Sequence, residues 1–173
     1  MADLRMQSPV ADRAADVAKI AELTGGAVQI AEVAFLQQID VRTRTPGSFR
    51  LPTDPNTWHD VDGSDALWLG PDEWLLVADP AADHGATAPD AESVVDVGAN
   101  RAVLDLIGPG VRDLLSKGCS LDLHATRWRD GACAQTMLAK APVILQQRGK
   151  VTRVFVRPSF ADYLVDWLLA ACG

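Results

Sequence analysis

Apolar positions in the second half of the chain change period several times, and each change predicts a new element. Ala102, Leu104 and Leu106 alternate with more polar residues, which indicates a strand. The strand-like stretch covers residues 94–107 and is interrupted near Gly98. We therefore expect two extended pieces joined by a short break.

A short helix is predicted directly after this strand. Gly108-Pro109-Gly110 opens it, because proline fits the first helical turn, where its missing N–H removes no hydrogen bond. Val111, Leu114 and Leu115 form its apolar stripe. Gly118 suits the C-terminal cap.

Three strands and a long helix are predicted for the C-terminal region. The strands cover residues 133–140, 143–147 and 151–157, with a polar turn at 147–150 between the last two. Pro158 ends the third strand, and Ser159 with Asp162 resembles a capping box. The apolar face of the following helix consists of Phe160, Leu164, Trp167, Leu168 and Ala171.

The first half is dominated by a hairpin. Residues 67–77 place apolar side chains on both sides of the turn Gly70-Pro71-Asp72-Glu73, with Trp68 and Trp74 opposite each other. Before it, residues 28–43 fit two short strands, and residues 48–65 fit a loop with one short helical turn. Residues 78–92, rich in alanine and containing His84, fit either a short helix or a loop.

The N-terminal segment, residues 1–27, is predicted to be a helix or an extended arm. Its apolar residues fall near helical spacing, and Gly25-Gly26 would end a helix. Most of those apolar residues are alanines, which bury little surface. We therefore expect this segment to be ordered by another surface, and residues 28–173 to form a single α+β domain.

Both halves show a similar order of elements, namely strand, helix, hairpin. The identity between the halves is slight, so a repeat here is topological. Two similar α+β units packed side by side explain the pattern.

Composition narrows the function. A chain of 173 residues with 48% hydrophobic content is long enough for a real core. Its formal charge of −7 disfavours nucleic acid as a partner. The sequence shows no secretory signal and no apolar run near the roughly 20 residues that span a bilayer. The three widely spaced cysteines Cys119, Cys133 and Cys172 favour a reducing compartment, so we expect the cytoplasm.

No motif for phosphate or dinucleotide binding is complete. Gly108-Pro109-Gly110 precedes a helix, whose N-terminus attracts anions, but the third glycine of a dinucleotide fingerprint and the lysine of a phosphate loop are missing. A tight strand-to-helix turn explains it better.

The sequence also gives little support for metal binding or nucleophilic catalysis. Cys119, Asp122 and His124 lie close in sequence, but neither ligand pair typical of zinc is present, and His59 lies far away. His124 is the sole base near Cys119, and nothing in the sequence orients it. Paired carboxylates such as Asp60 and Asp62 lie in polar segments and fit a solvated surface. We predict no catalytic, cofactor-binding or metal-binding residue, and three reduced cysteines.

The five tryptophans are the remaining signal. Trp68 and Trp74 fit core packing across the hairpin. Trp58 and Trp128 lie among polar residues, so they are predicted contacts for a partner, since tryptophan is enriched at interface hot spots. Trp167 lies on an apolar helix face.

Three motifs in a fixed order resemble a known family. They are the hairpin at residues 67–77, the stretch from Asn100 to Gly110, and Gly118-Cys119-Ser120-Leu121-Asp122-Leu123-His124. Together they resemble the gamma subunit of heterotetrameric sarcosine oxidase, a member of the folate-binding group that includes the glycine-cleavage T-protein. The resemblance runs from about Val28 to the C-terminus.

The resemblance implies a folate-binding, aminomethyltransferase-like α+β fold. It also implies a noncatalytic gamma subunit of an enzyme that converts sarcosine to glycine, hydrogen peroxide and a one-carbon unit. The larger alpha and beta subunits would be its partners and would carry FAD, FMN, NAD and tetrahydrofolate, with no cofactor in this chain. The alternatives are a stand-alone folate-binding protein and a one-carbon, aminomethyl transferase.

Overall fold

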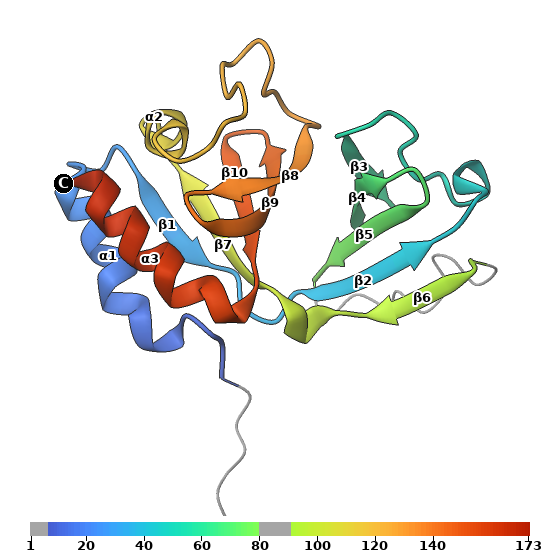
Figure 1. The fold of residues 1–173 in the computed structure, drawn as a ribbon, viewed down its shortest axis with the longest axis horizontal. Coiled ribbons are helices and arrows are strands. Elements are labelled where there is room, and N and C mark those ends of the chain that lie inside the picture. The colour runs from blue at the N-terminus through green and yellow to red at the C-terminus, as the bar shows by residue number, and fades with distance from the viewer. Residues whose placement is uncertain (1–6, 80–90) are drawn as a thin grey trace, which may run out of the picture.

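The computed structural model describes residues 7–79 and 91–173. Within these residues the chain forms two five-stranded antiparallel sheets and three α-helices (Figure 1). The first sheet has the order β1-β7-β10-β9-β8, at Gln29–Glu32, Ala102–Ile107, Val151–Val156, Ala141–Arg148 and Cys133–Leu138. The second has the order β3-β4-β5-β2-β6, at Trp58–Val61, Ser64–Gly70, Glu73–Ala78, Gln37–Arg42 and Ser93–Asp96.

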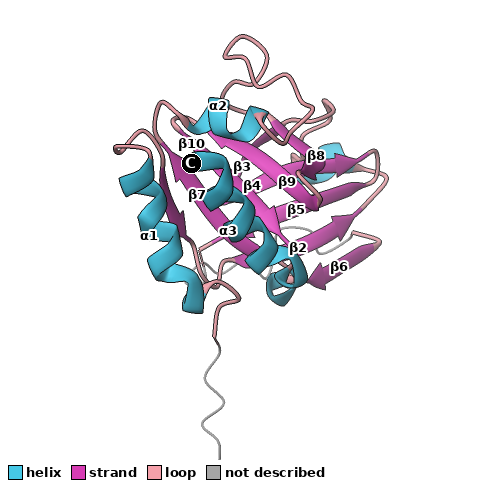
Figure 2. Cartoon of the chain, turned by 60° about the vertical axis from the view of Figure 1, so that its left-hand side comes forward, coloured by secondary structure: helices cyan, strands magenta, loops and turns pink. Residues whose placement is uncertain are grey.

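All three helices lie on the first sheet. They are α1 (Ala14–Leu23), α2 (Val111–Ser116) and α3 (Pro158–Cys172), and Figure 2 shows them in front of its strands. Three short 3₁₀ turns complete the described elements: η1 (Ala11–Arg13), η2 (Pro46–Phe49) and η3 (Gly98–Asn100). The predicted α+β class is confirmed.

The two halves exchange their leading strands. β1 precedes β2 along the chain, yet it pairs with β7 of the other sheet. Likewise β6 precedes β7 but pairs with β2. Two connecting segments therefore cross between the sheets, one from Val33 to Leu36 and one from Val97 to Arg101. The predicted pair of similar units is confirmed, and in the first of them the 3₁₀ turn η2 stands where the second has α2.

Three apolar layers hold the sheets. The helices bury Leu104, Leu164 and other side chains against the first sheet. Between the sheets, Leu67 and Leu75 of the second meet Phe155 of the first. On the far side of the second sheet, the segment around Leu51 covers a third cluster. Because β4 and β5 have apolar neighbours on both faces, they are buried almost continuously, which suits central strands.

The N-terminal segment packs on its own domain, contrary to our expectation. Val10, Val17 and Ile20 are buried in the helix-side core, with Ile20 fully inaccessible. Arg13 forms ion pairs with Asp162, at 3.2 Å, and with Asp166, both on α3. Three branched side chains and one arginine thus supply the contact that the alanines do not. That residues 28–173 fold as a separate unit stays a prediction.

The loop predicted at residues 48–65 is wrong for its second part. It contains β3 and the start of β4, joined by Asp62-Gly63 with φ of 52° and 84°. Two successive positive φ angles define the tight turn that Asp-Gly favours in hairpins. The polar, exposed residues His59 and Asp60 hid the short strand.

The capping box predicted for α3 is also wrong. The helix begins at Pro158, and its N-cap Arg157 makes no side-chain capping bond. Asp162 pairs with Arg13 instead. The break predicted near Gly98 is confirmed as η3 between β6 and β7. The prediction for residues 78–92 falls mainly on 80–90, outside the described residues.

Candidate functional site

The cysteines are placed as structural residues. Cys133 is fully buried between the sheets, where its thiol donates to the carbonyl oxygen of Thr57 at 3.2 Å. Burial raises the pKa of this thiol to about 12, so it holds its proton at neutral pH. Cys119 is buried and lies 3.8 Å from the Thr136 hydroxyl, while Cys172 is half-buried near the C-terminus. None of the three is paired with another cysteine.

The structure does not bring the histidines and carboxylates together. His124 is exposed, and its Nδ1 lies 2.9 Å from the Thr126 hydroxyl rather than near a thiol. His59 is exposed against the carbonyl oxygen of Arg50, and His84 lies outside the described residues. Across residues 7–79 and 91–173, no group of three or more His, Cys, Asp or Glu side chains converges as a metal site would require. The absence of catalytic and metal residues stays a prediction.

Gly108-Pro109-Gly110 is a tight strand-to-helix turn. Gly108 has φ of 128°, and a Cβ there would lie 2.2 Å from the carbonyl oxygen of Ala27. The Gly110 N–H donates to the same oxygen at 2.9 Å. Backbone therefore fills the space in which a phosphate would have to lie. This turn does not fit a nucleotide.

The tryptophans lie either in an apolar core or where the two sheets meet. Trp68 and Trp74 pair across β4 and β5 as predicted, and Trp74 donates to the carbonyl oxygen of Pro52 at 2.8 Å. Trp58 is half-buried; it donates to Gln147, and the Arg148 guanidinium lies 5.7 Å from its ring centroid.

The prediction that Trp128 is exposed for a partner is wrong. Its side chain is 6% exposed within the helix-side core. The Arg112 guanidinium donates to the carbonyl oxygens of Leu123 and Trp128 at 2.6 and 2.8 Å, which folds the loop back over α2. Polar neighbours in sequence therefore misled the prediction. Trp167 packs against the same core, as its apolar helix face indicated.

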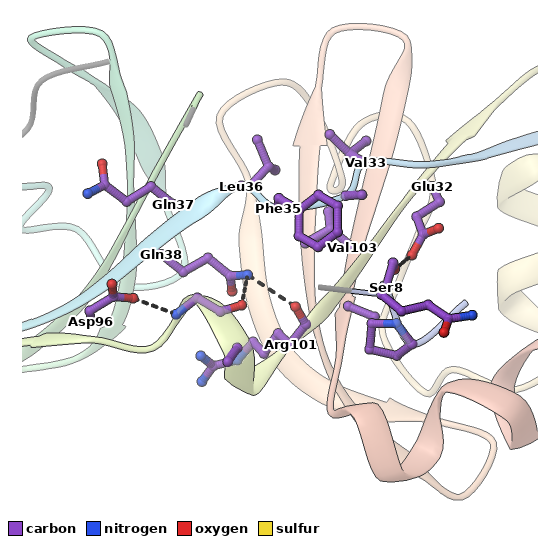
Figure 3. Close-up of a pocket in the computed structure, with 16 residues that line it drawn as sticks. Ser8, Glu32, Val33, Phe35, Leu36, Gln37, Gln38, Asp96, Arg101 and Val103 are labelled. Atoms are coloured by element: carbon purple, nitrogen blue, oxygen red, sulfur yellow. Dashed lines mark hydrogen bonds between the residues drawn. The ribbon is translucent and has the colours of Figure 1, made fainter. Parts of the chain in front are cut away.

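A cavity at the strand crossing is the best candidate site. It has a volume of about 680 Å³, within the range usual for ligand pockets. Its walls come from both crossing segments, from the ends of β1, β2, β6 and β7, and from the residues just before η1 (Figure 3). We call it the crossover cavity. It exists because the two halves exchange strands.

The crossover cavity contains a guanidinium without an ion pair. Arg101 lines it, and the Nη1 atom of Arg101 is buried with no hydrogen-bond partner among the described residues. Burial, then the charge of Arg157, lowers the pKa of Arg101, although Asp40 and Glu73 act in the opposite sense. Arg101 as a whole is only partly buried, so its guanidinium can still pair with an anion that enters the cavity.

Two glutamines add unsatisfied acceptors. Gln38 donates from Nε2 to the carbonyl oxygens of Arg101 and Gly98, at 3.2 and 3.5 Å (Figure 3). Its Oε1 atom, and that of Gln37, are buried without a partner in the described chain. Buried polar atoms are nearly always hydrogen-bonded in native proteins, so the wall of this cavity has acceptor atoms that still need a donor.

Phe35 is strained as well as exposed. It has φ of 60°, in the left-handed region that an aromatic residue rarely adopts, and its side chain is 49% exposed. It lies in the first crossing segment and lines the crossover cavity. Strain of this kind persists where surrounding structure enforces it, and it concentrates at functional sites.

The two carboxylates that line the cavity are already engaged. Glu32 accepts a hydrogen bond from the Ser8 hydroxyl, and burial raises the pKa of Glu32 above its ordinary value. Asp96 accepts from the Gly98 N–H at 2.8 Å. Neither a cysteine nor a histidine is among the described residues that line the cavity.

None of the cavity residues was nominated from the sequence. The break at Gly98 was the one available signal, since it marks where a strand leaves its sheet. A single arginine after such a break matches no anion-binding motif. Its lack of an ion-pair partner depends on the strand exchange.

Among the described residues, no helix is long and apolar enough to cross a membrane. Residues 56–173 match the model of the sarcosine oxidase gamma subunit family. The chain is 38% identical to the sarcosine oxidase subunit gamma of Corynebacterium sp. strain U-96, over 95% of this chain and 89% of that one.

Solved structures agree. A chain of the heterotetrameric sarcosine oxidase from Corynebacterium sp. U-96, in complex with pyrrole 2-carboxylate, is 34% identical with a TM-score of 0.83, covering 96% of this chain and 94% of that one. The glycine cleavage system aminomethyltransferase T from Bartonella henselae is 14% identical with a TM-score of 0.63, covering 88% and 48%. The second likeness concerns the fold alone and confirms the predicted aminomethyltransferase-like fold. Family match, sequence identity and near-complete coverage together establish that this chain belongs to the sarcosine oxidase gamma subunit family.

Proposed function

We propose that this chain is the gamma subunit of a heterotetrameric sarcosine oxidase and that it supports the assembly without catalytic residues of its own. The likeness to a chain of the Corynebacterium complex, over nearly the whole of both chains, carries this proposal. Its partners are the larger alpha and beta subunits, and its site of action is the cytoplasm. The complex converts sarcosine to glycine, hydrogen peroxide and a one-carbon unit.

The cofactors of such a complex, FAD, FMN, NAD and tetrahydrofolate, belong on the partner subunits in this proposal. The geometry of this chain supports that assignment. Its one glycine-rich turn before a helix is filled by the backbone of Ala27, and α2 behind it has six residues. A dinucleotide requires an open turn there, because its pyrophosphate contacts the backbone N–H groups directly.

Co-expression with the larger subunits tests the role. We expect the chain to co-purify with them at fixed stoichiometry, and the complex without it to be less stable. We expect the chain by itself to be colourless and to produce no peroxide from sarcosine. A flavin absorption band in the pure chain, or a chain that elutes alone from the co-expression, contradicts the proposal.

A folate-binding protein is the rival, and the crossover cavity is the observation in its favour. A transferase would need a free carboxylate in that cavity, but Glu32 and Asp96 are both bonded. Titration with tetrahydrofolate, followed by quenching of the five tryptophans, separates the two roles. We expect no saturable quenching.

A further inference from the structure

Apolar exposure in the described chain is concentrated at the strand crossing. Val94 and Val95 on β6 are 52% and 49% exposed, and Phe35 is 49% exposed. These are the three most exposed large apolar side chains in residues 7–79 and 91–173. Asp96, the last residue of β6, lines the crossover cavity, and Val94 shares its face of the strand, whereas Val95 points to the opposite face.

The charge at the same place is unusual for this protein. The chain carries a formal charge of −7, yet Arg101, which lines the cavity and is partly buried, has no ion pair among residues 7–79 and 91–173. A guanidinium without a direct ion pair favours a partner carboxylate at one position of the surface. Complementary charge of this kind sets the register of an interface more than its total affinity.

We propose that the crossover cavity receives a segment of a larger sarcosine oxidase subunit that carries a carboxylate beside an apolar side chain. The carboxylate pairs with Arg101, and the apolar side chain packs on Phe35. This assignment rests on the proposed subunit role and names the surface through which that role is exercised.

A protein segment suits the cavity better than a small molecule. Phe35 is half exposed, and Val94, on the same face of β6 as Asp96, is also half exposed outside the cavity. A small ligand would leave that surface in water, whereas a chain segment covers both. Aromatic and arginine side chains are also the types enriched at interface hot spots.

In the free subunit, this arrangement lowers the free energy of unfolding. Arg101 loses hydration without gaining an anion, and Phe35 holds a backbone conformation suited to glycine or asparagine. Residues that serve binding rather than stability can be recognised by mutation, because replacing them stabilises the isolated chain. A structural arginine or phenylalanine behaves in the opposite way.

Two substitutions exploit that difference, each measured in the full chain and in co-expression with the larger subunits. Arg101→Met removes the charge and keeps the length. Phe35→Asn relieves the backbone and removes the ring. We expect each to weaken assembly by at least about tenfold in dissociation constant, as truncation of an interface anchor does. The melting temperature of the isolated chain should stay the same or rise by a few degrees.

The matched controls lie far from the crossing. Arg127→Met removes an exposed arginine of the loop after α2, and Met137→Asn removes a side chain on β8 that is 46% exposed. Both should assemble like the unaltered chain.

A crosslink identifies the occupant. With benzoyl-phenylalanine in place of Phe35, illumination of the complex should attach a peptide of a larger subunit, and that peptide should contain an aspartate or glutamate.

The outcomes separate this surface from the subunit role. If the unaltered chain does not assemble, the subunit role itself fails. If the unaltered chain assembles and both variants do so equally well, the surface is wrong. It is also wrong if the variants lower the melting temperature and assembly together, or if the crosslinked peptide has no acidic residue.

Discussion

The two halves of the molecule place an aspartate at the same point of the same strand and surround it differently. Asp105 is the fourth residue of β7, and Asp40 is the fourth residue of β2. Asp105 lies opposite Arg153 of β10, which binds it with two hydrogen bonds of 2.7 and 2.9 Å. Asp40 lies opposite Leu75 of β5.

The two aspartate side chains are equally exposed, at 16%, but Arg42 beside Asp40 is 48% exposed whereas Arg153 is 8% exposed. The Asp40 carboxylate is 3.6 Å from Arg42, which also contacts Glu73 at 3.1 Å. One half is therefore closed by a bidentate ion pair with a buried arginine, whereas the arginine of the charge cluster in the other half is half exposed. The crossover cavity with Arg101 borders that second half. Two units of the same topology can therefore differ in how fully their charged groups are paired.

Breaking the closed half should have the largest effect. Asp105→Asn leaves the Arg153 charge buried, so we expect a loss of about 3–5 kcal/mol in the free energy of unfolding, measured by urea denaturation. Asp40→Asn should change it by less than about 1 kcal/mol, because Arg42, the charge left behind, is 48% exposed and stays hydrated.

The double change Asp105→Leu with Arg153→Leu copies the leucine found at the equivalent place in β5. It should recover most of the stability, because apolar replacement of a buried pair is often neutral. A single Asp105→Asn variant as stable as the unaltered chain shows that the pair does not close this half.

The turn after β7 should be the next most sensitive point. Gly108→Ala places a methyl group 2.2 Å from the backbone oxygen of Ala27, at φ of 128°. We expect a loss of about 2–4 kcal/mol, measured by thermal unfolding. Gly63→Ala has a positive φ but open space, so it isolates the conformational cost. Equal losses in the two variants contradict the role assigned to the close contact.

The smallest effect concerns pH and the half with the charge cluster. Burial, and then the adjacent Asp40, raises the pKa of Glu73 above its ordinary value of 4.5. The folded chain therefore holds this proton more tightly than the unfolded chain does. The contribution of Glu73 to stability is present below the unfolded pKa and is lost as the pH rises through the folded one.

Unfolding at a series of pH values from about 4 to 7 checks this expectation for Glu73. The Glu73→Gln variant should lose less stability than the unaltered chain as the pH rises, and Glu92→Gln, at an exposed carboxylate, serves as control. Parallel profiles for the unaltered chain and Glu73→Gln contradict it.

Patterns among neighbouring residues correctly predicted the elements whose formation depends on those neighbours alone. The alternation in β7, the stripe of α2 and the turn of the β4–β5 hairpin all follow from neighbours within a few residues. The pairing of Gln29 with Ile107 does not, because periodicity specifies which face is buried and not which strand lies alongside. The crossover cavity and its unpaired Arg101 are consequences of that pairing, so they were beyond the reach of the same patterns. Trp128 shows the converse, since its polar neighbours in sequence are not its neighbours in space.

The exchange of strands also has a consequence for how the chain folds. β1 finds its hydrogen-bonding partner only in β7, on the far side of the five strands of the second sheet, so the first sheet cannot be completed from one contiguous stretch. Contacts between distant residues delay the folding transition, since the loop between them must close first. On the ribosome, β1 therefore waits without a partner while the consecutive strands β2 to β6 emerge, and it joins its sheet only after β7 has followed them.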